Sequence, residues 1–230
     1  MSTEQLTVVV PVLNEERHLE SLTRHLNSLC CPVIVVDGGS TDRTYAKLRD
    51  LTAPHITVDR TVRGRGLQMN FGASMARTPL LLFLHADTLL PPEGASLAAE
   101  VLTNSSSTWG RFDISFDESA IPLRTIAWFM NWRSALTGIC TGDQAIFTTA
   151  KTFELVGRFK QIPLMEDIEI SKQLKKIGKP ARVRVPVITA ARRWRTNGVA
   201  RTMLTMWWLR FRYWYGASPD LLAEYYKHAR

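Results

Sequence analysis

The chain has 230 residues, enough for one large domain or two small ones, and its even composition favours one. Hydrophobic residues make up 45% and charged residues 22%, as in an ordinary soluble globular protein. The net charge of +8 indicates a polyanionic partner (nucleic acid, anionic lipid or a phosphorylated ligand) or simply a soluble basic protein.

Three cysteines, two of them adjacent, form neither a disulfide framework nor a metal-ligand spacing, so we expect a reducing compartment. The apolar runs are too short to span a membrane, and the first residues lack the basic region and cleavage site of a signal peptide. These observations predict a cytoplasmic protein that is not integral to a membrane.

The first half of the chain alternates between apolar strands and amphipathic helices, a pattern that predicts a mostly parallel sheet covered on both faces. The predicted strands are residues 7–12, 33–36, 56–58 and 79–84. The predicted helices are residues 15–29, about 40–49, 66–77 and about 93–102.

The second half is more irregular. Residues 109–116 alternate between polar and apolar, as in an edge or antiparallel strand. Further strands are predicted at 143–148 and 182–185, and helices at 121–136, at 166–177 and over the last thirty residues. Without a repeat or low-complexity linker, we predict a single α/β domain.

Three of the predicted strands end in polar side chains: Asn14 and Glu15 after the first, Asp37 after the second and Asp87 after the fourth. The carboxyl ends of parallel strands open into a crevice where ligands bind. These residues therefore predict a nucleotide and metal site.

Asp37 is followed by two glycines and the start of a helix, which suits close approach of a ligand backbone and binding of an anion. No Gly-Lys-Ser/Thr follows, which excludes a P-loop, and no GxGxxG follows the first strand. His85 and Asp87 are two residues apart, so their side chains point the same way from extended backbone. A divalent cation that bridges a diphosphate needs few protein ligands, although His85 alone is equally compatible with a packed histidine.

Five segments, PVLNEE, VVDGGSTD, GRGLQMNFGA, LHAD and MED, resemble in order the motifs of family-2 glycosyltransferases of the GT-A fold, in particular a short soluble bacterial subgroup. The resemblance covers about residues 6 to 195. It implies one glycosyltransferase domain over 1–230, with a nucleotide-binding half at about 1–103, an acceptor half at about 104–195 and C-terminal helices at about 196–230.

The resemblance also assigns roles to residues of the first half. The nucleoside is expected near Pro11, Asn14 and Glu15, with Asp37 at the edge of the base. The ribose and donor sugar are expected near Arg65, Gln68 and Asn70. Asp87 matches the last acid of the family's metal-binding DxD motif, and His85 stands where the first acid is expected. The expected cofactor is Mn²⁺ or Mg²⁺, and Mn²⁺ tolerates an imidazole ligand better.

In the second half, the resemblance places Asp143 and Trp194 on the acceptor side and Arg193 at the leaving nucleoside diphosphate. It makes Asp167 the general base for the acceptor hydroxyl, with Glu166 as the fallback. Direct displacement by that hydroxyl inverts the anomeric centre. Two adjacent carboxylates raise one pKa, which suits a base, but acids at a helix start also simply complement the helix dipole.

Residues 201–215 combine tryptophans and arginines on a broad helical face. Such a helix suits an anionic membrane interface and a lipid-linked acceptor, with peripheral attachment to an inner membrane. The alternatives are a core-facing helix or a homodimer contact.

The main hypothesis is therefore a metal-assisted inverting glycosyltransferase that uses a nucleotide-diphosphate sugar and a hydroxyl acceptor, with no nucleic-acid partner. A sugar-1-phosphate nucleotidyltransferase is a second possibility, but such enzymes favour a basic glycine-rich loop after the first strand, where this chain is acidic. A non-enzymatic basic module that binds membrane or nucleic acid explains the charge but not the acids at the strand ends.

Overall fold

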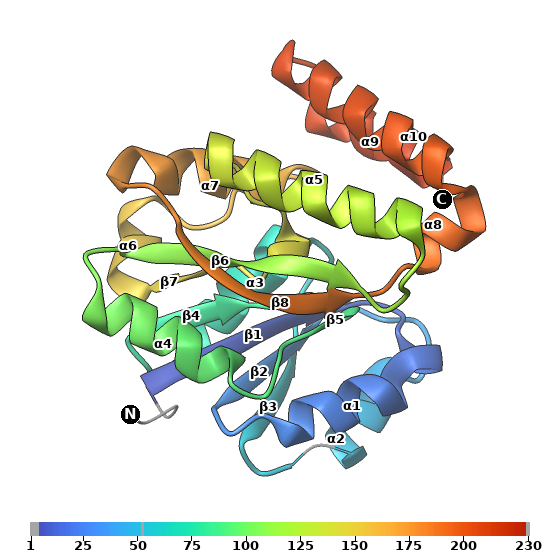
Figure 1. Ribbon diagram of the computed structural model, residues 1–230. Helices are drawn as coiled ribbons and strands as arrows, with labels where there is room; N and C mark the ends of the chain where they lie inside the picture. Colours follow the sequence, from blue (N-terminus) through green and yellow to red (C-terminus); the bar gives the residue numbers. More distant parts are fainter. Residues whose placement is uncertain (1–4, 52, 229–230) are drawn as a thin grey trace.

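The computed structural model describes residues 5–51 and 53–228, which form one mixed sheet with helices on both faces (Figure 1). Its eight strands follow the order β3-β2-β1-β4-β7-β6-β8-β5. The strands are β1 (Leu6–Val12), β2 (Val33–Asp37), β3 (Ile56–Arg60), β4 (Leu80–Phe83), β5 (Thr88–Leu89), β6 (Trp109–Phe116), β7 (Phe147–Thr149) and β8 (Ala181–Thr189).

Strands β1 to β4 are parallel to one another, as the alternation of strands and helices predicts. The pairs β4–β7, β6–β7 and β5–β8 are antiparallel, while β6–β8 is parallel. Parallel pairs thus outnumber antiparallel pairs by four to three, and the predicted mostly parallel α/β sheet is confirmed.

Strand β6 lies inside the sheet and is antiparallel to β7, so the edge position predicted for residues 109–116 is wrong and the alternative, an antiparallel strand, is confirmed. Its polar residues suggested an exposed face, yet Arg111 is fully buried and Asp113 is 8% exposed. The two side chains form an ion pair with each other, and Arg182 of β8 donates to both oxygens of Asp113. Mutual neutralisation therefore allows charged residues at positions where alternation predicts contact with water.

The helices mostly match their predicted ranges. They are α1 (Leu19–Ser28), α2 (Thr44–Leu51), α3 (Arg65–Met75), α4 (Gly94–Asn104), α5 (Ile121–Thr137), α6 (Ala150–Leu155), α7 (Glu166–Ile177), α8 (Arg192–Asn197), α9 (Val199–Trp214) and α10 (Pro219–His228). Two short 3₁₀ turns are η2 (Glu16–His18) and η3 (Gly142–Gln144). The strand predicted at 143–148 is thus a turn followed by β7, and β5, α6 and α8 were not predicted.

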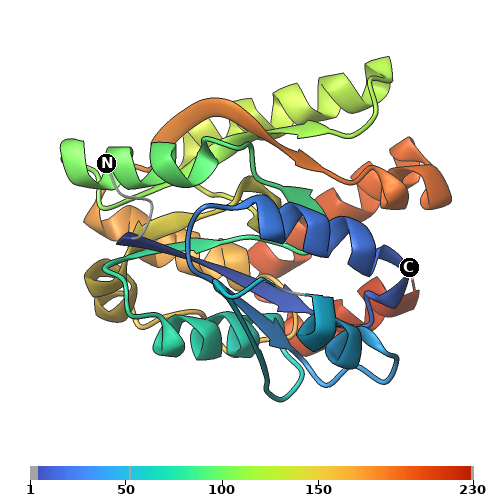
Figure 2. The same ribbon diagram turned by 90° about the horizontal axis from the view of Figure 1, so that it is seen from below.

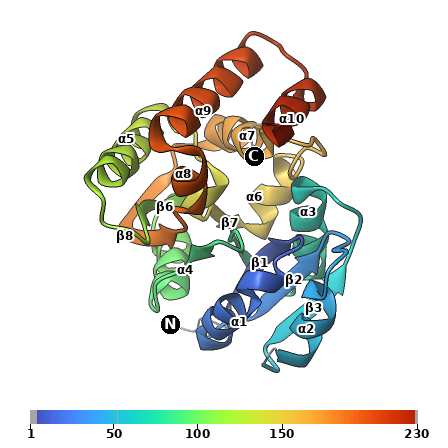
Figure 3. The ribbon, with the colours of Figure 1, turned by 90° about the vertical axis from the view of Figure 1, so that its right-hand side faces the viewer.

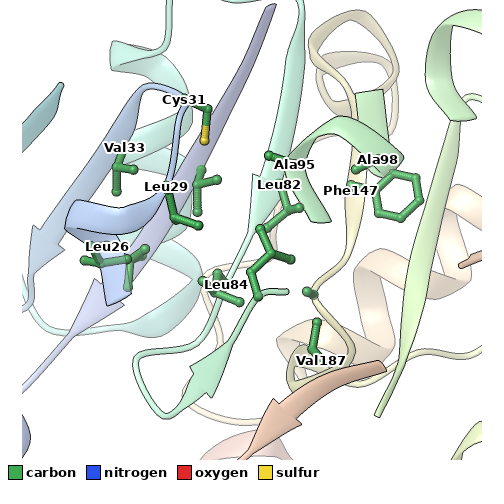
Figure 4. Close-up of a cluster of buried hydrophobic side chains, with 14 of the residues drawn as sticks. Leu26, Leu29, Cys31, Val33, Leu82, Leu84, Ala95, Ala98, Phe147 and Val187 are labelled. Atoms are coloured by element: carbon green, nitrogen blue, oxygen red, sulfur yellow. The ribbon is translucent and has the colours of Figure 1, made fainter. Parts of the chain in front are cut away.

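Alternate side chains of β1 pack on opposite faces of the sheet. Val8 and Val10 join a core cluster with α1 and α4, part of which is shown in Figure 4. Val9 joins a second cluster with Met69 of α3 and Phe153 of α6. Figures 1 and 2 show the corresponding helices on the two faces. Both faces of the central strands are therefore covered, which explains their nearly continuous apolar sequence.

The C-terminal helices α9 and α10 lie beyond the sheet, next to α5 and α7 (Figure 3). Leu209 and Leu222 are buried in a small cluster with Met165 and Ile168 at the start of α7. Most of the aromatic side chains of α9 remain exposed. Within residues 5–51 and 53–228, no helix combines the length and the apolar composition that a membrane crossing requires.

Candidate active site

A cavity of about 820 Å³ opens at the carboxyl ends of β1 and β4, between the first half of the chain and the helices α5, α8 and α9. Its polar end is formed by the loop after β1, the turn after β4 and η3. This end contains Asn14, Glu15, Arg17, His18, Asp42, Arg63, Asp87, Asp143, Arg192 and Trp194. The cavity therefore lies where the polar side chains at the strand ends predict a ligand-binding crevice.

The loop after β1 is held by the loop after β2. Asn14 adopts a left-handed backbone conformation with φ of 54°, which asparagine tolerates better than most residues. Its Oδ1 accepts a hydrogen bond of 2.9 Å from Thr41 N, and its own N–H donates to Ser40 Oγ. The N–H of Glu15 donates to Thr44 Oγ1 at 2.8 Å. Two of the three residues predicted near the nucleoside, Asn14 and Glu15, thus line the cavity in a fixed conformation.

Asp37 is fully buried at the end of β2 and organises the loop that follows. Its Oδ2 accepts hydrogen bonds of 3.0 Å from the N–H groups of Gly39 and Ser40, and 2.9 Å from Arg60 Nε. Ser40 Oγ donates to its other oxygen. Asp37 is outside the cavity lining, so its contact with a base stays a prediction.

Three other residues that were predicted to contact the nucleotide sugar are buried or hydrogen-bonded within the fold. Pro11 is buried within β1. Gln68 Nε2 donates to the carbonyls that end β1 and β2, both at 2.8 Å. Asn70 forms two hydrogen bonds with the main chain of Phe159. Among the described residues these three do not line the cavity, and a direct contact with the donor stays a prediction.

His85, Asp87 and Asp143 form a cluster whose possible metal-binding atoms all lie within 4.8 Å of one another. His85 Nδ1 lies 3.2 Å from Asp143 Oδ1. β4 ends at Phe83 and residues 86–87 form a turn, so the turn, and not extended backbone, brings His85 and Asp87 together. Asp143 was predicted only on the acceptor side. Imidazole with two carboxylates is a donor set that fits Mn²⁺ better than Mg²⁺.

Gly142 allows this cluster to form, because a Cβ at this position would lie 2.1 Å from Cε1 and Nε2 of the His85 ring. We therefore expect Gly142→Ala to displace the imidazole and weaken Mn²⁺ binding about tenfold or more. Isothermal titration with Mn²⁺ measures the effect. Gly178→Ala is the control, because nothing lies within 4 Å of that position. Equal Mn²⁺ affinity in both variants would contradict the packing argument.

Glu166 and Asp167 open α7 in different environments. Glu166 is 2% exposed, and its Oε1 lies 3.1 Å from Nη1 of Arg65, another predicted donor residue. Asp167 is partly exposed, and its two oxygens accept hydrogen bonds from Gly142 N (3.0 Å) and Ile168 N (2.8 Å). Neither acid is part of the cavity lining, but Asp167 reaches η3, which carries Asp143. The structure thus connects the predicted base with the candidate metal site.

Burial raises the pKa of Glu166, and the Arg65 guanidinium offsets this only in part. A carboxyl group whose pKa is higher in the folded state contributes most to stability below its unfolded value of about 4.5, and this contribution is lost as the pH rises through the raised pKa. Glu166→Gln should therefore flatten the decline in unfolding free energy above this pH. Urea unfolding from pH 4 to pH 8 tests this. Glu154→Gln, on an exposed ion pair, should keep the wild-type profile.

The segment 192–195 lies at the cavity through Arg192 and Trp194. Trp194 packs edge-to-face against Phe116 with ring centroids 5.6 Å apart, and Arg192 lies 3.9 Å from Glu15. The side chain of Arg193, the predicted contact of the leaving group, lies outside the described residues. Sequence reasoning missed the cavity residues Arg17, His18, Arg63, Arg133 and Arg210. Basic residues after the acidic strand ends were the available signal for the first three.

Comparison with solved structures supports the same fold. The chain superimposes on the mannosyltransferase PcManGT from Pyrobaculum calidifontis, solved in complex with GDP-Man and Mn²⁺, with a TM-score of 0.63 and 21% identity over 84% of this chain and 61% of that one. For residues 1–349 of TarS from S. aureus, the TM-score is 0.64 at 17% identity, over 86% of this chain and 64% of that one. At these identities the likeness concerns the fold alone, and the predicted GT-A fold is confirmed.

Two curated proteins match shorter segments. A 4,4'-diaponeurosporenoate glycosyltransferase of Staphylococcus haemolyticus is 33% identical over 101 residues, which make up 41% of this chain and 27% of that protein. A dolichol-phosphate mannosyltransferase of Pyrococcus furiosus is 28% identical over 109 residues, or 44% of this chain and 31% of that protein. The chain thus spans less than a third of the length of either relative.

The family described as glycosyl transferase family 2 matches over residues 7–155, which is more than half of the chain. This range contains the loops after β1 and β2, the turn after β4 and η3. On this match, and as its motifs predict, the chain belongs to glycosyl transferase family 2.

Proposed function

We propose that this protein transfers a sugar from a nucleotide-diphosphate sugar to a hydroxyl acceptor, with inversion and with the help of a divalent cation. One observation carries the proposal: the nucleotide-side loops meet Asp87 and Asp143 of the His85–Asp87–Asp143 cluster at a single cavity, and Asp167 accepts a hydrogen bond from the turn that carries Asp143. The complexes of PcManGT with GDP-Man and Mn²⁺ and of TarS with UDP-GlcNAc support a donor and a metal of this kind.

The donor is expected to lie against the loop after β1. Asn14 and Glu15 would border the nucleoside. Asp37 could contact the nucleobase once a carboxylate oxygen is released from its hydrogen bond with Ser40 or Arg60. Arg192 and Arg63 line the same end of the cavity and supply positive charge for the diphosphate. Fixed cations of this kind also stabilise the negative charge that develops as the nucleoside diphosphate departs.

His85, Asp87 and Asp143 would hold Mn²⁺ or Mg²⁺, and their ligand atoms are close enough to share one ion. When bound, the cation neutralises charge on the diphosphate and improves it as a leaving group. The remaining coordination positions suit phosphate oxygens and water.

Asp167 is the proposed general base. Its carboxylate is partly exposed and keeps a lone pair on each oxygen after accepting the two main-chain hydrogen bonds. It would accept the proton of the acceptor hydroxyl as the oxygen attacks the anomeric carbon from the face opposite the leaving group. The bond to the diphosphate breaks as the new glycosidic bond forms, which inverts the configuration. Glu166 is less suited, because Arg65 holds it in the protein interior.

A panel of UDP-, GDP- and dTDP-sugars with Mn²⁺ or Mg²⁺ tests the proposal. We expect one donor to raise the melting temperature in the presence of metal and to undergo slow hydrolysis. Asp37→Ala should remove both responses, while Asp50→Ala, at an exposed position on α2, should keep them. A chain that responds to no donor with either metal does not have this function.

A further inference from the structure

The second end of the cavity is apolar and does not match the polar groups of a nucleotide sugar. Helices α5 and α9 line it with seven apolar side chains: Ile126, Trp128, Phe129, Met130, Met203, Met206 and Trp207. Rings of Phe129 and Trp207 meet across the two helices with centroids 5.8 Å apart. A sugar nucleotide presents hydroxyl and phosphate groups along most of its length, so an apolar wall of this size calls for a different ligand.

Two arginines stand within this apolar end. Arg133 donates one hydrogen bond of 3.1 Å to the carbonyl of Ile139, but its Nε and Nη2 are buried without a hydrogen-bond partner among the described residues. Arg210 lines the same end. Burial and the charge of Arg210 lower the pKa of Arg133 to about 10, so it stays cationic at neutral pH. A half-buried cation whose buried N–H groups are unsatisfied gains most from an anion placed beside it.

The combination of aromatic and basic side chains extends from the cavity onto the exposed surface of α5 and α9. Together α5 and α9 carry five arginines and five of the seven tryptophans of the chain, but no aspartate or glutamate. Trp128 is 64% exposed, Trp132 50% and Trp214 75%. Exposed tryptophan and arginine without acidic neighbours match the interface of an anionic bilayer in both polarity and charge.

We propose that the acceptor is an anionic amphiphile drawn from a lipid surface: its apolar chain lies between α5 and α9, and its anionic group binds Arg133 and Arg210. The proposal rests on the proposed function, because it assigns the acceptor of the same cavity. The charges of Arg133 and of Asp167, the proposed base, are close enough to interact, so the anionic group would lie on the side of the apolar end where the acceptor hydroxyl meets the donor.

Fluorescence titration without any donor tests the binding step. The probes are dodecyl phosphate, inorganic phosphate and dodecanol, which separate the anion from the chain. Because five of the seven tryptophans lie on α5 and α9, emission should shift to shorter wavelength with dodecyl phosphate. We expect dodecyl phosphate to bind at least tenfold more tightly than either other probe. Arg210→Gln should lower the affinity for dodecyl phosphate about tenfold. Arg24→Gln, an exposed cation on α1, should change nothing.

A second measurement tests the surface. The protein should sediment with vesicles of phosphatidylglycerol and phosphatidylcholine but not with phosphatidylcholine alone. Trp214→Ser, outside the cavity lining, should weaken binding to the anionic vesicles several-fold. Leu155→Ser, at a position that is 73% exposed on α6, should leave this binding unchanged. Both surface variants should keep their thermal response to the sugar donor. A failure of the acceptor proposal can therefore be told apart from a failure of the proposed sugar transfer.

Three results would overturn the inference. One is equal affinity for dodecyl phosphate and inorganic phosphate. Another is an Arg210→Gln variant that loses affinity for the nucleotide donor and keeps its affinity for dodecyl phosphate, which would assign the arginines to the donor. The third is a dimer in light scattering that Trp214→Ser dissociates, with no vesicle binding, which would make this face a contact between two copies.

Discussion

Asp167→Asn should reduce sugar transfer by about 10²- to 10⁴-fold while donor binding stays close to that of the wild type. The amide is nearly isosteric, and its oxygen can still accept the hydrogen bond from Gly142 N, so η3 keeps its position. What is lost is the ability to accept the proton of the acceptor hydroxyl. Transfer rates with a saturating donor, together with donor-induced thermal shifts, separate the two effects.

Glu166→Gln is the informative comparison for this variant, because it replaces the neighbouring acid that Arg65 holds. If Asp167 is the base, Glu166→Gln should retain much more transfer activity than Asp167→Asn. The reverse order would assign the base to Glu166. Similar rates for wild type and Asp167→Asn would remove both the proposed base and the reason for direct displacement at this position.

Asp87→Asn should weaken Mn²⁺ binding and lower donor turnover by about 100-fold or more. The side chain supplies one of the two carboxylates of the cluster, and an amide binds divalent cations much less strongly than a carboxylate does. Mn²⁺ titration by calorimetry and donor hydrolysis at several Mn²⁺ concentrations measure both effects. A higher Mn²⁺ concentration should restore part of the activity.

His85→Asp provides the matched test of ligand type at the same cluster. An all-carboxylate set should shift the preference from Mn²⁺ toward Mg²⁺. Asp59→Asn, outside the cluster, should leave metal affinity and turnover unchanged. Asp87→Asn with wild-type Mn²⁺ affinity and turnover would show that the three side chains do not hold the metal.

The first half of the fold could be predicted from sequence because its strands are short apolar runs that end in turn residues. Each of β1, β2 and β4 lies within about two residues of its predicted range. Family membership and the GT-A fold follow from the same segments. Local pattern was sufficient here because each of these strands is buried on both faces, so its period and composition are unambiguous.

The second half could not be predicted in the same way, because long-range contacts decide it. The ion pair of Asp113 with Arg182, 69 positions away, helps to place a polar strand inside the sheet. The contact of Asp143 with His85 joins residues 58 positions apart. In the first half, the hydrogen bonds of Gln68 to the carbonyls of Val12 and Val36 likewise depend on the packing of α3. None of these contacts leaves a local signature, although the acids at the strand ends indicated where the site would form.

The cationic side of the site was also hidden from sequence reasoning. Arg133 lies within a helix that the sequence predicts, but only the packing of the fold shows that its Nε and Nη2 are buried without partners. Arg210 belongs to the aromatic segment that was predicted as a helix at a membrane, in the core or in a dimer contact, but its position in the cavity depends on how α9 lies beside α5 (Figure 3).

Turn η3 joins the candidate metal ligands to the proposed base through two consecutive residues. Gly142 packs against the ring of His85 on one side and donates its N–H to Asp167 on the other, and Asp143 follows directly. A cation held by His85 and Asp143 would therefore also influence the direction in which Asp167 faces the acceptor. The cation with the highest affinity would then not need to support the fastest transfer, because its radius would affect the alignment of Asp167 as well as the stabilisation of the leaving group.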